Sequence, residues 1–220
     1  MSKRLALFIL STICFFSRSL FATTEFSPTY SHPFYLGAIA GYGSTTWNGL
    51  VPPNDKQSTA LLLSTPSNAK DGGGVWGWLV GYEFMPQFAL ELSYMHYPNA
   101  KIFFDESSLV AFENNGLTEL SSSTESLSLM TKFMVFIPTT DIRIFSSVGA
   151  ARVHRKDILN EAWRISPTFG VGFNFNLTEH LMAELVFNYT GGYAQSELDP
   201  SQDYVPFLYS GVAHLAYRFG

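Results

Sequence analysis

The chain has almost no cysteine. Its single thiol, Cys14, lies in an apolar segment near the start of the 220-residue sequence. Without that segment no disulfide can form, although an exported protein would be permitted one. Long apolar runs are absent too, because no stretch after residue 22 reaches the roughly 18 residues that a transmembrane helix needs. Neither disulfides nor a membrane-spanning helix can therefore stabilise the mature chain.

The first 22 residues have the layout of a secretory signal peptide. Lys3 and Arg4 precede an apolar run from Leu5 to Phe16, and the small residue Ala22 follows. The run has about 12 residues, which is too short for the roughly 20 that cross a bilayer as a helix. We expect cleavage near Ala22 and export across the inner membrane.

Positive charge is scarce. The whole chain has 13 Lys and Arg residues against 18 Asp and Glu residues. The expected signal peptide removes three of these bases and no acid, which leaves 10 bases against 18 acids and a net charge of −8. Such an acidic balance argues against nucleic acid as a partner.

Apolar and small or polar residues alternate over many segments. In the stretch FGVGFNFNL, Phe169 to Leu177, every second residue is apolar and the others are Gly or Asn. This period of two predicts a strand with one apolar face. The same test along the chain predicts eight strands: 34–47, 74–84, 88–98, 124–137, 141–154, 164–175, 181–193 and 205–219.

The connections between these strands are short and long in turn. Three are tight turns, at 85–87, 138–140 and 176–180, whereas the other four are longer and rich in Ser, Asn, Gly, Pro and acids. An even number of strands with all long loops at one end is typical of outer-membrane barrels. We therefore predict an all-β fold, an eight-stranded antiparallel up-and-down transmembrane β-barrel. The expected parts are a signal peptide, a short periplasmic segment and the barrel: 1–22, 23–33 and 34–220.

The pleat alone allows two orientations of the apolar face. A soluble barrel of lipocalin type would turn it inward, and a membrane barrel would turn it outward. Eight strands leave an interior barely wide enough for side chains, too narrow for this many aromatic rings. The aromatic residues also gather near strand ends, as in the girdles of membrane barrels. These are Phe34, Phe84, Phe88, Phe136, Phe175 and Phe219 at the turn end, and Trp47, Trp76, Tyr94 and Tyr189 at the loop end.

The opposite face carries charges that cancel. Three acids and three bases would face the interior, together with one histidine, and mutual pairing would offset the cost of burying them. Met130 and Phe145 would help to fill the lumen. The predicted lumenal polar network consists of Glu83, Glu91, Lys132, Arg143, Glu184, His214 and Arg218.

Three segments carry a family resemblance: GWLVGYEFMPQFALELSYMHY at 77–97, SPTFGVGFNFNLTEH at 166–180 and the final YRFG at 217–220. They resemble the OmpA-like transmembrane β-barrel family of Gram-negative outer membranes. The resemblance implies that Glu91 and Lys132 belong to a lumenal ion-pair network. Where the family has an inward arginine this chain has Glu184, so Arg143 or Arg218 would have to supply the cation.

The resemblance also implies a role for the last strand. Barrels of this family commonly end in alternating apolar residues with a terminal aromatic, which the outer-membrane assembly machinery reads. Leu215, Tyr217 and Phe219 match that signal, although Gly220 follows Phe219. Many relatives continue into a peptidoglycan-binding domain where this sequence stops, so we expect no tether to the cell wall.

Motifs for catalysis or cofactors are weak. The five histidines show no metal-ligand spacing, and none is followed two residues later by serine, as in lipid A deacylases. We therefore expect no metal, no cofactor and no enzymatic activity. The expected partners are outer-membrane lipids and lipopolysaccharide, the barrel assembly machinery, and a host or environmental surface contacted by the loops. Two alternatives remain: a lipid-processing barrel enzyme and a soluble periplasmic lipocalin-like binder.

Overall fold

A computed structural model describes residues 33–52, 63–193 and 204–219. The expected signal peptide and nearly all of the 23–33 segment lie outside these described residues. None of the helices in the described part of the chain is long and apolar enough to cross a membrane.

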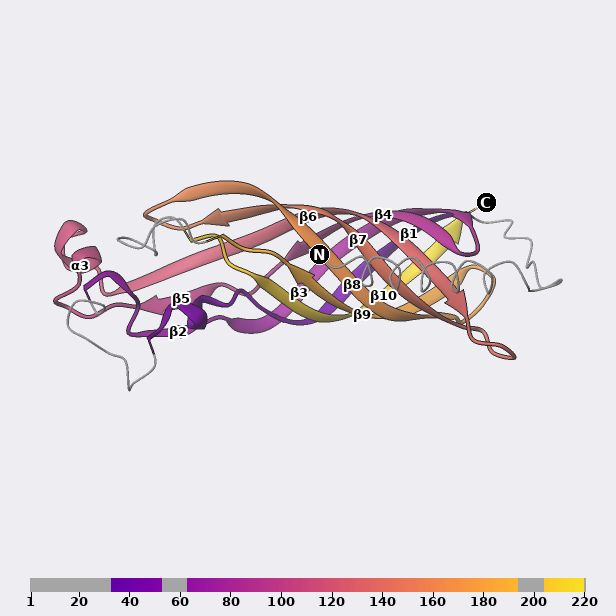
Figure 1. Ribbon diagram of the computed structural model, residues 1–220, viewed down its shortest axis with the longest axis horizontal. Coiled ribbons are helices and arrows are strands. Elements are labelled where there is room, and N and C mark those ends of the chain that lie inside the picture. Colours follow the sequence, from indigo (N-terminus) through magenta and orange to yellow (C-terminus); the bar gives the residue numbers. More distant parts are fainter. Residues whose placement is uncertain (1–32, 53–62, 194–203, 220) are drawn as a thin grey trace, which may run out of the picture. The chain divides into compact units, whose positions relative to one another are not determined.

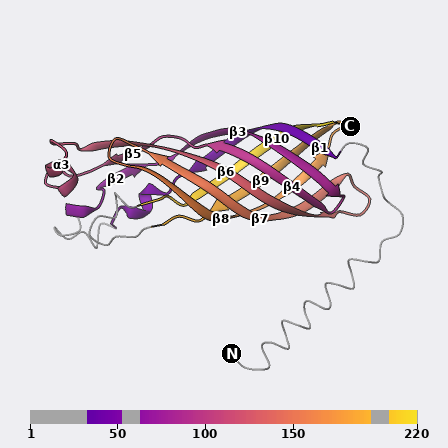
Figure 2. The ribbon, with the colours of Figure 1, turned by 90° about the horizontal axis from the view of Figure 1, so that it is seen from above.

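The described chain forms a closed antiparallel barrel. Its ring runs β1-β3-β4-β6-β7-β8-β9-β10, and β10 pairs with β1 to close it. Figures 1 and 2 show the strands tilted around the barrel wall. The predicted eight-stranded antiparallel barrel is confirmed. Its strands are β1 (Phe34–Ser44), β3 (Gly72–Met85), β4 (Phe88–His96), β6 (Glu119–Phe136), β7 (Ile142–Lys156), β8 (Glu161–Asn176), β9 (Leu181–Thr190) and β10 (Leu208–Phe219).

Further elements gather at the loop end of the barrel. Two short strands, β2 (Asn68–Lys70) and β5 (Ala100–Phe103), extend the wall by pairing β2 with β5 and β5 with the start of β6. A 3-10 helix η1 (Trp47–Leu50) and a short helix α3 (Leu109–Glu113) lie in the same loops. Figures 1 and 2 place α3, β2 and β5 at the end opposite the C-terminus. We call this assembly the outer cap.

Strand ends differ from the prediction mainly at the cap. β6 begins at Glu119 rather than at 124, because its first residues pair with β5. β1 ends at Ser44 rather than at 47, because the chain turns into η1 at that point. Alternation within each strand could not reveal either feature, since both depend on contacts between loops.

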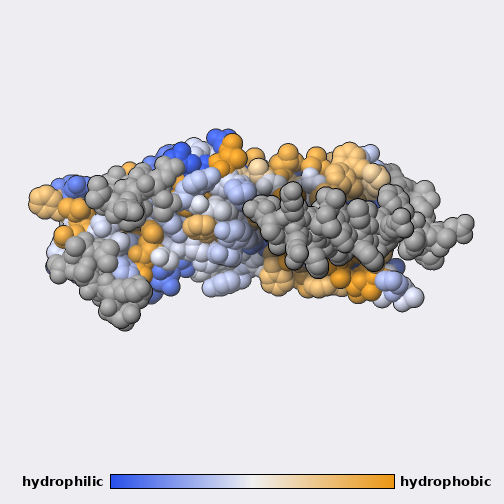
Figure 3. Space-filling view, viewed as in Figure 1, coloured by the Kyte–Doolittle hydropathy of each residue, from blue (hydrophilic) through white to orange (hydrophobic). Residues whose placement is uncertain are grey.

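The apolar face of the wall points outward. Trp78 is 43% exposed, whereas Glu91 is 3% and Lys132 2% exposed. In Figure 3 hydrophobic residues gather on the wall toward the turn end, and hydrophilic residues predominate toward the cap. A soluble barrel with an apolar interior is therefore the wrong alternative, and the orientation expected for a membrane barrel is correct.

Two aromatic residues were placed wrongly in the predicted girdles. Trp47 is fully buried in the cap, because η1 turns its indole under the loops instead of toward lipid. Phe136 lies opposite the buried Arg143 on β7, with its ring 5.6 Å from the guanidinium carbon. It therefore shares the lumenal side of β6, because alternation from the buried Lys132 and Met134 puts position 136 on that face.

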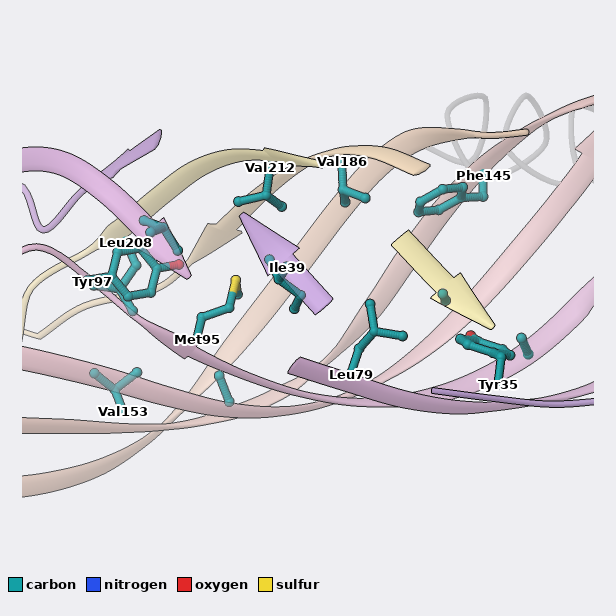
Figure 4. Packing of buried hydrophobic residues seen from close by; sticks show 14 of the residues in the cluster. Tyr35, Ile39, Leu79, Met95, Tyr97, Phe145, Val153, Val186, Leu208 and Val212 are labelled. Atoms are coloured by element: carbon teal, nitrogen blue, oxygen red, sulfur yellow. The ribbon is translucent and has the colours of Figure 1, made fainter. Parts of the chain in front are cut away.

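The buried apolar residues form two clusters. One fills the lumen, and Figure 4 shows Ile39, Leu79 and Met95 projecting between the strands into the interior. The other lies in the cap and includes Trp47 and Tyr204. The lumen is therefore packed with side chains along much of its length, as expected for eight strands.

Candidate functional site

The lumenal network has Lys132 at one of its two centres. The Lys132 ammonium on β6 lies 2.5 Å from Glu91 Oε2 on β4 and 2.7 Å from Glu184 Oε2 on β9. The Tyr35 hydroxyl donates to Glu91 at 3.1 Å, and His214 Nδ1 lies 3.0 Å from Glu184. One ammonium thus joins two carboxylates from separate parts of the ring.

Glu83 is the second centre. On β3 it receives Arg143 of β7 through one carboxylate oxygen and Arg218 of β10 through the other, the latter at 2.9 Å. Asn174 links the two centres, because its carbonyl accepts from Arg143 at 2.8 Å and its amide donates to Glu184 at 2.8 Å. Glu83 thus connects β3 across the lumen with β7 and β10, neither of which is its neighbour in the ring.

The charges of this network are balanced and buried. Glu83, Glu91 and Glu184 oppose Lys132, Arg143 and Arg218, so the network is neutral when His214 is neutral. Buried charges are tolerated when they are paired and hydrogen-bonded. The Lys132 ammonium also lies 4.7 Å from the centroid of the Phe145 ring. Chemically, this arrangement can hold the wall together by pairing buried charges from several strands.

The structure brings all seven residues of the predicted network into the lumen. Its pairing differs from one expectation, since Lys132 supplies the cation for Glu184 while Arg143 and Arg218 serve Glu83. Sequence reasoning missed Tyr35 and Asn174 as members of the network. Their positions on the inward face were readable from alternation, but their partners were not.

The lumen also holds a group with metal-ligating atoms. Oxygens of Glu91 and Glu184 and a nitrogen of His214 lie within 4.8 Å of one another. The ammonium of Lys132 already occupies the place between the two carboxylates. An ion there would have to displace that lysine, so the group fits an ion-pair network better than a metal centre.

The cap contains a buried cation that the sequence analysis did not single out. Arg155, near the end of β7, is fully buried; it donates to Asp157 at 2.6 Å and to the carbonyl of Tyr204 at 2.6 Å. Its guanidinium carbon lies 4.6 Å from the centroid of the Trp47 ring. Burial raises the pKa of the Tyr204 phenol, so this side chain is neutral and donates to the carbonyl of Thr46. No sequence signal connects these positions.

The expected assembly-signal residues lie on the outer face of β10. Leu215, Tyr217 and Phe219 are all exposed there. The ring of Phe219 lies 4.9 Å from that of Tyr217 and 6.0 Å from that of Phe34 on β1. They therefore line the seam at which the last strand closes on the first.

A closed antiparallel barrel with an apolar exterior and a neutralised, filled interior defines an integral outer-membrane β-barrel. The chain belongs to the family described as outer membrane protein beta-barrel domain, whose model matches residues 13–210. It is accordingly a protein of the Gram-negative outer membrane.

Solved structures are similar to this chain at low sequence identity. OprG from Pseudomonas aeruginosa is 12% identical over 86% of this chain and 96% of its own, with a TM-score of 0.50. The N-terminal β-barrel domain of Pseudomonas aeruginosa OprF is 14% identical over 84% and 97%, with a TM-score of 0.46. Neisserial surface protein A is 11% identical over 84% and 97%, with a TM-score of 0.47. None of the curated proteins matches this chain significantly.

Proposed function

We propose that the protein is a non-enzymatic outer-membrane barrel with a closed lumen, which supports envelope integrity and presents its outer cap for contact with a host or environmental surface. The observation that carries this proposal is the bridge from Lys132 to Glu91 and Glu184, because it fills the lumen with paired and buried charge. The protein then acts through its two surfaces, one in contact with lipid and one outside the cell.

The closed lumen can be tested by conductance. The purified protein in a planar bilayer is expected to show no steady open state, since the lumenal network and the apolar cluster fill the interior. Replacement of both Glu91 and Lys132 by alanine keeps the charge balance and removes bulk, so it should raise conductance. A persistent large conductance of the wild type would contradict the closed lumen.

The cap offers a built contact surface. Helix α3 begins at Ser108, whose hydroxyl accepts a hydrogen bond from the Ala111 amide at 3.1 Å. Val110 and Ala111 are buried in the cap, whereas Phe112 is 86% exposed and Leu109 is exposed beside it. Two large apolar side chains are thus held outward on an anchored turn, which favours contact with another surface over packing within the barrel.

The charges around this turn indicate which kind of partner surface the cap would contact. Asp105, Glu106 and Glu113 lie in the same loop, and residues 102–118 contain no Lys or Arg. Two hydrogen bonds from Ser107 hold the pKa of Asp105 below its ordinary value, so this carboxylate is ionised at neutral pH. We expect the cap to favour a partner with basic groups around an apolar patch.

A strain lacking the protein, complemented with the wild type or with the double variant Leu109→Ser, Phe112→Ser, separates the two proposed roles. The wild type should restore both resistance to detergent and attachment to cultured epithelial cells. The double variant should restore resistance but not attachment. Equal attachment by the two complemented strains would exclude α3 as the contact surface.

The absence of enzymatic activity has its own test. Lipid A and phospholipids extracted after overexpression should have the same masses as those of the parent strain. A new lipid species that disappears in the His96→Ala, His154→Ala variant would support the lipid-processing alternative instead.

A further inference from the structure

A row of outward-facing residues crosses five strands of the wall just below the cap. In the strand register Trp76 of β3 lies opposite His96 of β4, followed by Glu125 of β6, His154 of β7 and Trp163 of β8. Two histidines 58 positions apart in the sequence thus flank one carboxylate. The sequence analysis found no ligand spacing because these residues meet only through strand pairing.

Glu125 faces the two imidazoles with its two oxygens. His96 Nδ1 lies 3.4 Å from Oε1, and His154 Nδ1 lies 3.9 Å from Oε2. Both separations exceed the usual 2.7–3.2 Å of an N–H···O hydrogen bond. Within the described part of the chain, Glu125 has ion-pair contacts only with these two histidines, and its other polar neighbour is the phenol of Tyr94. It is therefore a carboxylate on the outer wall that no lysine or arginine neutralises.

The ring of His154 is held in place from two sides. It stacks on Trp163 with centroids 3.7 Å apart and planes 6° apart, and its Nε2 lies 3.1 Å from Glu161 Oε1. When Nε2–H donates to Glu161, Nδ1 carries a lone pair directed at the Glu125 carboxylate. Two electron-rich atoms facing each other favour a cation between them. A carboxylate on the far nitrogen is also the usual way in which a metal-ligating histidine is oriented.

We propose that His96, Glu125 and His154 form a binding site for a divalent transition-metal ion such as Zn²⁺, Ni²⁺ or Cu²⁺. Imidazole nitrogens with a carboxylate are suitable ligands for these ions. Two ligands about 2.1 Å from one tetrahedral ion lie roughly 3.4 Å apart, which is the separation of His96 Nδ1 from Glu125 Oε1. β6 separates the two histidine strands by about 4.8 Å on each side. The ligand atoms of the three residues do not all lie within 4.8 Å of one another among the described residues, so the His96 ring must turn toward Glu125 for both imidazoles to bind one ion.

Access and charge also fit such a site. The side chains of His96, Glu125 and His154 are 26%, 37% and 13% exposed, so an ion can enter from outside while the ligands stay partly ordered. The net charge of the whole chain is −5, which favours cations near the wall. Nearby positive charge is held elsewhere, since Arg152 lies over the Trp163 ring and Lys156 pairs with Glu161. The site is independent of the surface contact proposed for α3.

Metal binding can be measured directly on the full protein purified from outer membranes in detergent. Isothermal titration with ZnCl₂ or NiCl₂ at pH 7.5 should show one site per chain. CuCl₂ should quench tryptophan fluorescence, because the indoles of Trp76 and Trp163 adjoin the two histidines. Binding should weaken as the pH is lowered, because metal binding requires deprotonated ligands.

Single substitutions should show which residues bind the ion. His96→Gln, His154→Gln and Glu125→Gln should each weaken affinity by about tenfold or more, and Glu161→Gln should weaken it by about 10–100-fold as an orienting group. His180→Gln is the matched control, because this residue stacks on Tyr217 at the turn end, away from the row. Heat-modifiable gel migration of every variant reports that the barrel is intact.

Three outcomes would overturn the proposal. One is the absence of binding to wild type at millimolar metal. A second is unchanged affinity after both His96 and His154 are replaced in an intact barrel. The third is loss of binding in His214→Gln alone, which would place the ion at the lumenal Glu91, Glu184 and His214 group instead.

Discussion

The ammonium of Lys132 lies 2.7 Å from the carboxylate of Glu184 across the lumen, and both side chains are almost completely buried. Their strands, β6 and β9, are three positions apart in the ring of the barrel. The contact is therefore a strut through the interior rather than a link between neighbouring strands. It ties the stability of the wall to the neutrality of the lumen.

Replacement of Lys132 by methionine should destabilise the barrel strongly. The change leaves Glu91 and Glu184 without their common cation, and removing one partner of a buried pair costs about 3–5 kcal/mol. Urea unfolding of the protein in detergent micelles or lipid vesicles measures the loss. The control is Lys101→Met, because Lys101 pairs with Glu119 in an exposed contact at 3.1 Å, which is worth at most about 1 kcal/mol. Equal effects of the two variants would contradict a special role for the lumenal strut.

Gly81→Ala should loosen the network without touching a charge. A Cβ at Gly81 would lie 2.1 Å from the Tyr35 ring, so the ring must move away from Glu91, to which its hydroxyl donates. We expect a loss of about 1–3 kcal/mol from overpacking, measured by the same unfolding experiment. Gly74→Ala is the matched control on the same strand, because a Cβ there meets nothing within 4 Å. If Gly81→Ala leaves the free energy of unfolding unchanged, close packing against Gly81 does not hold Tyr35 in place.

Arg155→Ala should open the cap and leave the barrel intact. The guanidinium bonds to Asp157 and Tyr204 and lies over Trp47, so three separate loops lose their common contact. Limited proteolysis of intact cells should then cleave the loops faster, while heat-modifiable migration of the membrane-protected barrel persists. Exposed Arg152→Ala provides the comparison and should leave the cleavage rate near wild type. Protection equal to wild type in both variants would contradict the role given to Arg155.

Phe219→Ala should slow assembly of the barrel in the outer membrane. Phe219 ends β10 on the outer face and adjoins the ring of Phe34 at the closing seam. If the assembly machinery reads this residue, unassembled protein should accumulate in the periplasm, which pulse-labelling with a gel-shift assay measures. Phe187→Ala removes a comparable exposed ring on β9 and should assemble at the normal rate. Identical kinetics of the two variants would argue against a terminal signal.

Some structural features could be predicted from the sequence of a single strand, and others could not. Alternation on β8 between Phe169 and Leu177 was enough to predict a strand with one apolar face. The predicted girdle was wrong at Trp47, where the chain leaves the wall, and at Phe136, which alternation from the buried Lys132 and Met134 places on the lumenal face. The cap escaped prediction, because Arg155 at the end of β7 meets Trp47 and Tyr204 from two loops without a periodic pattern.

The amino-acid sequence by itself determined the barrel, the outward direction of its apolar face and the identity of the lumenal charges. Each of these depends on local alternation and on the order of short and long connections. Only the tertiary structure decided which charges pair and which outer residues meet. Glu184 meets Lys132, and Glu125 meets His96 and His154, through the register of paired strands. A slip of one residue in that register would turn every side chain of a strand to the opposite face, so partners that are distant in sequence are fixed only when the ring closes.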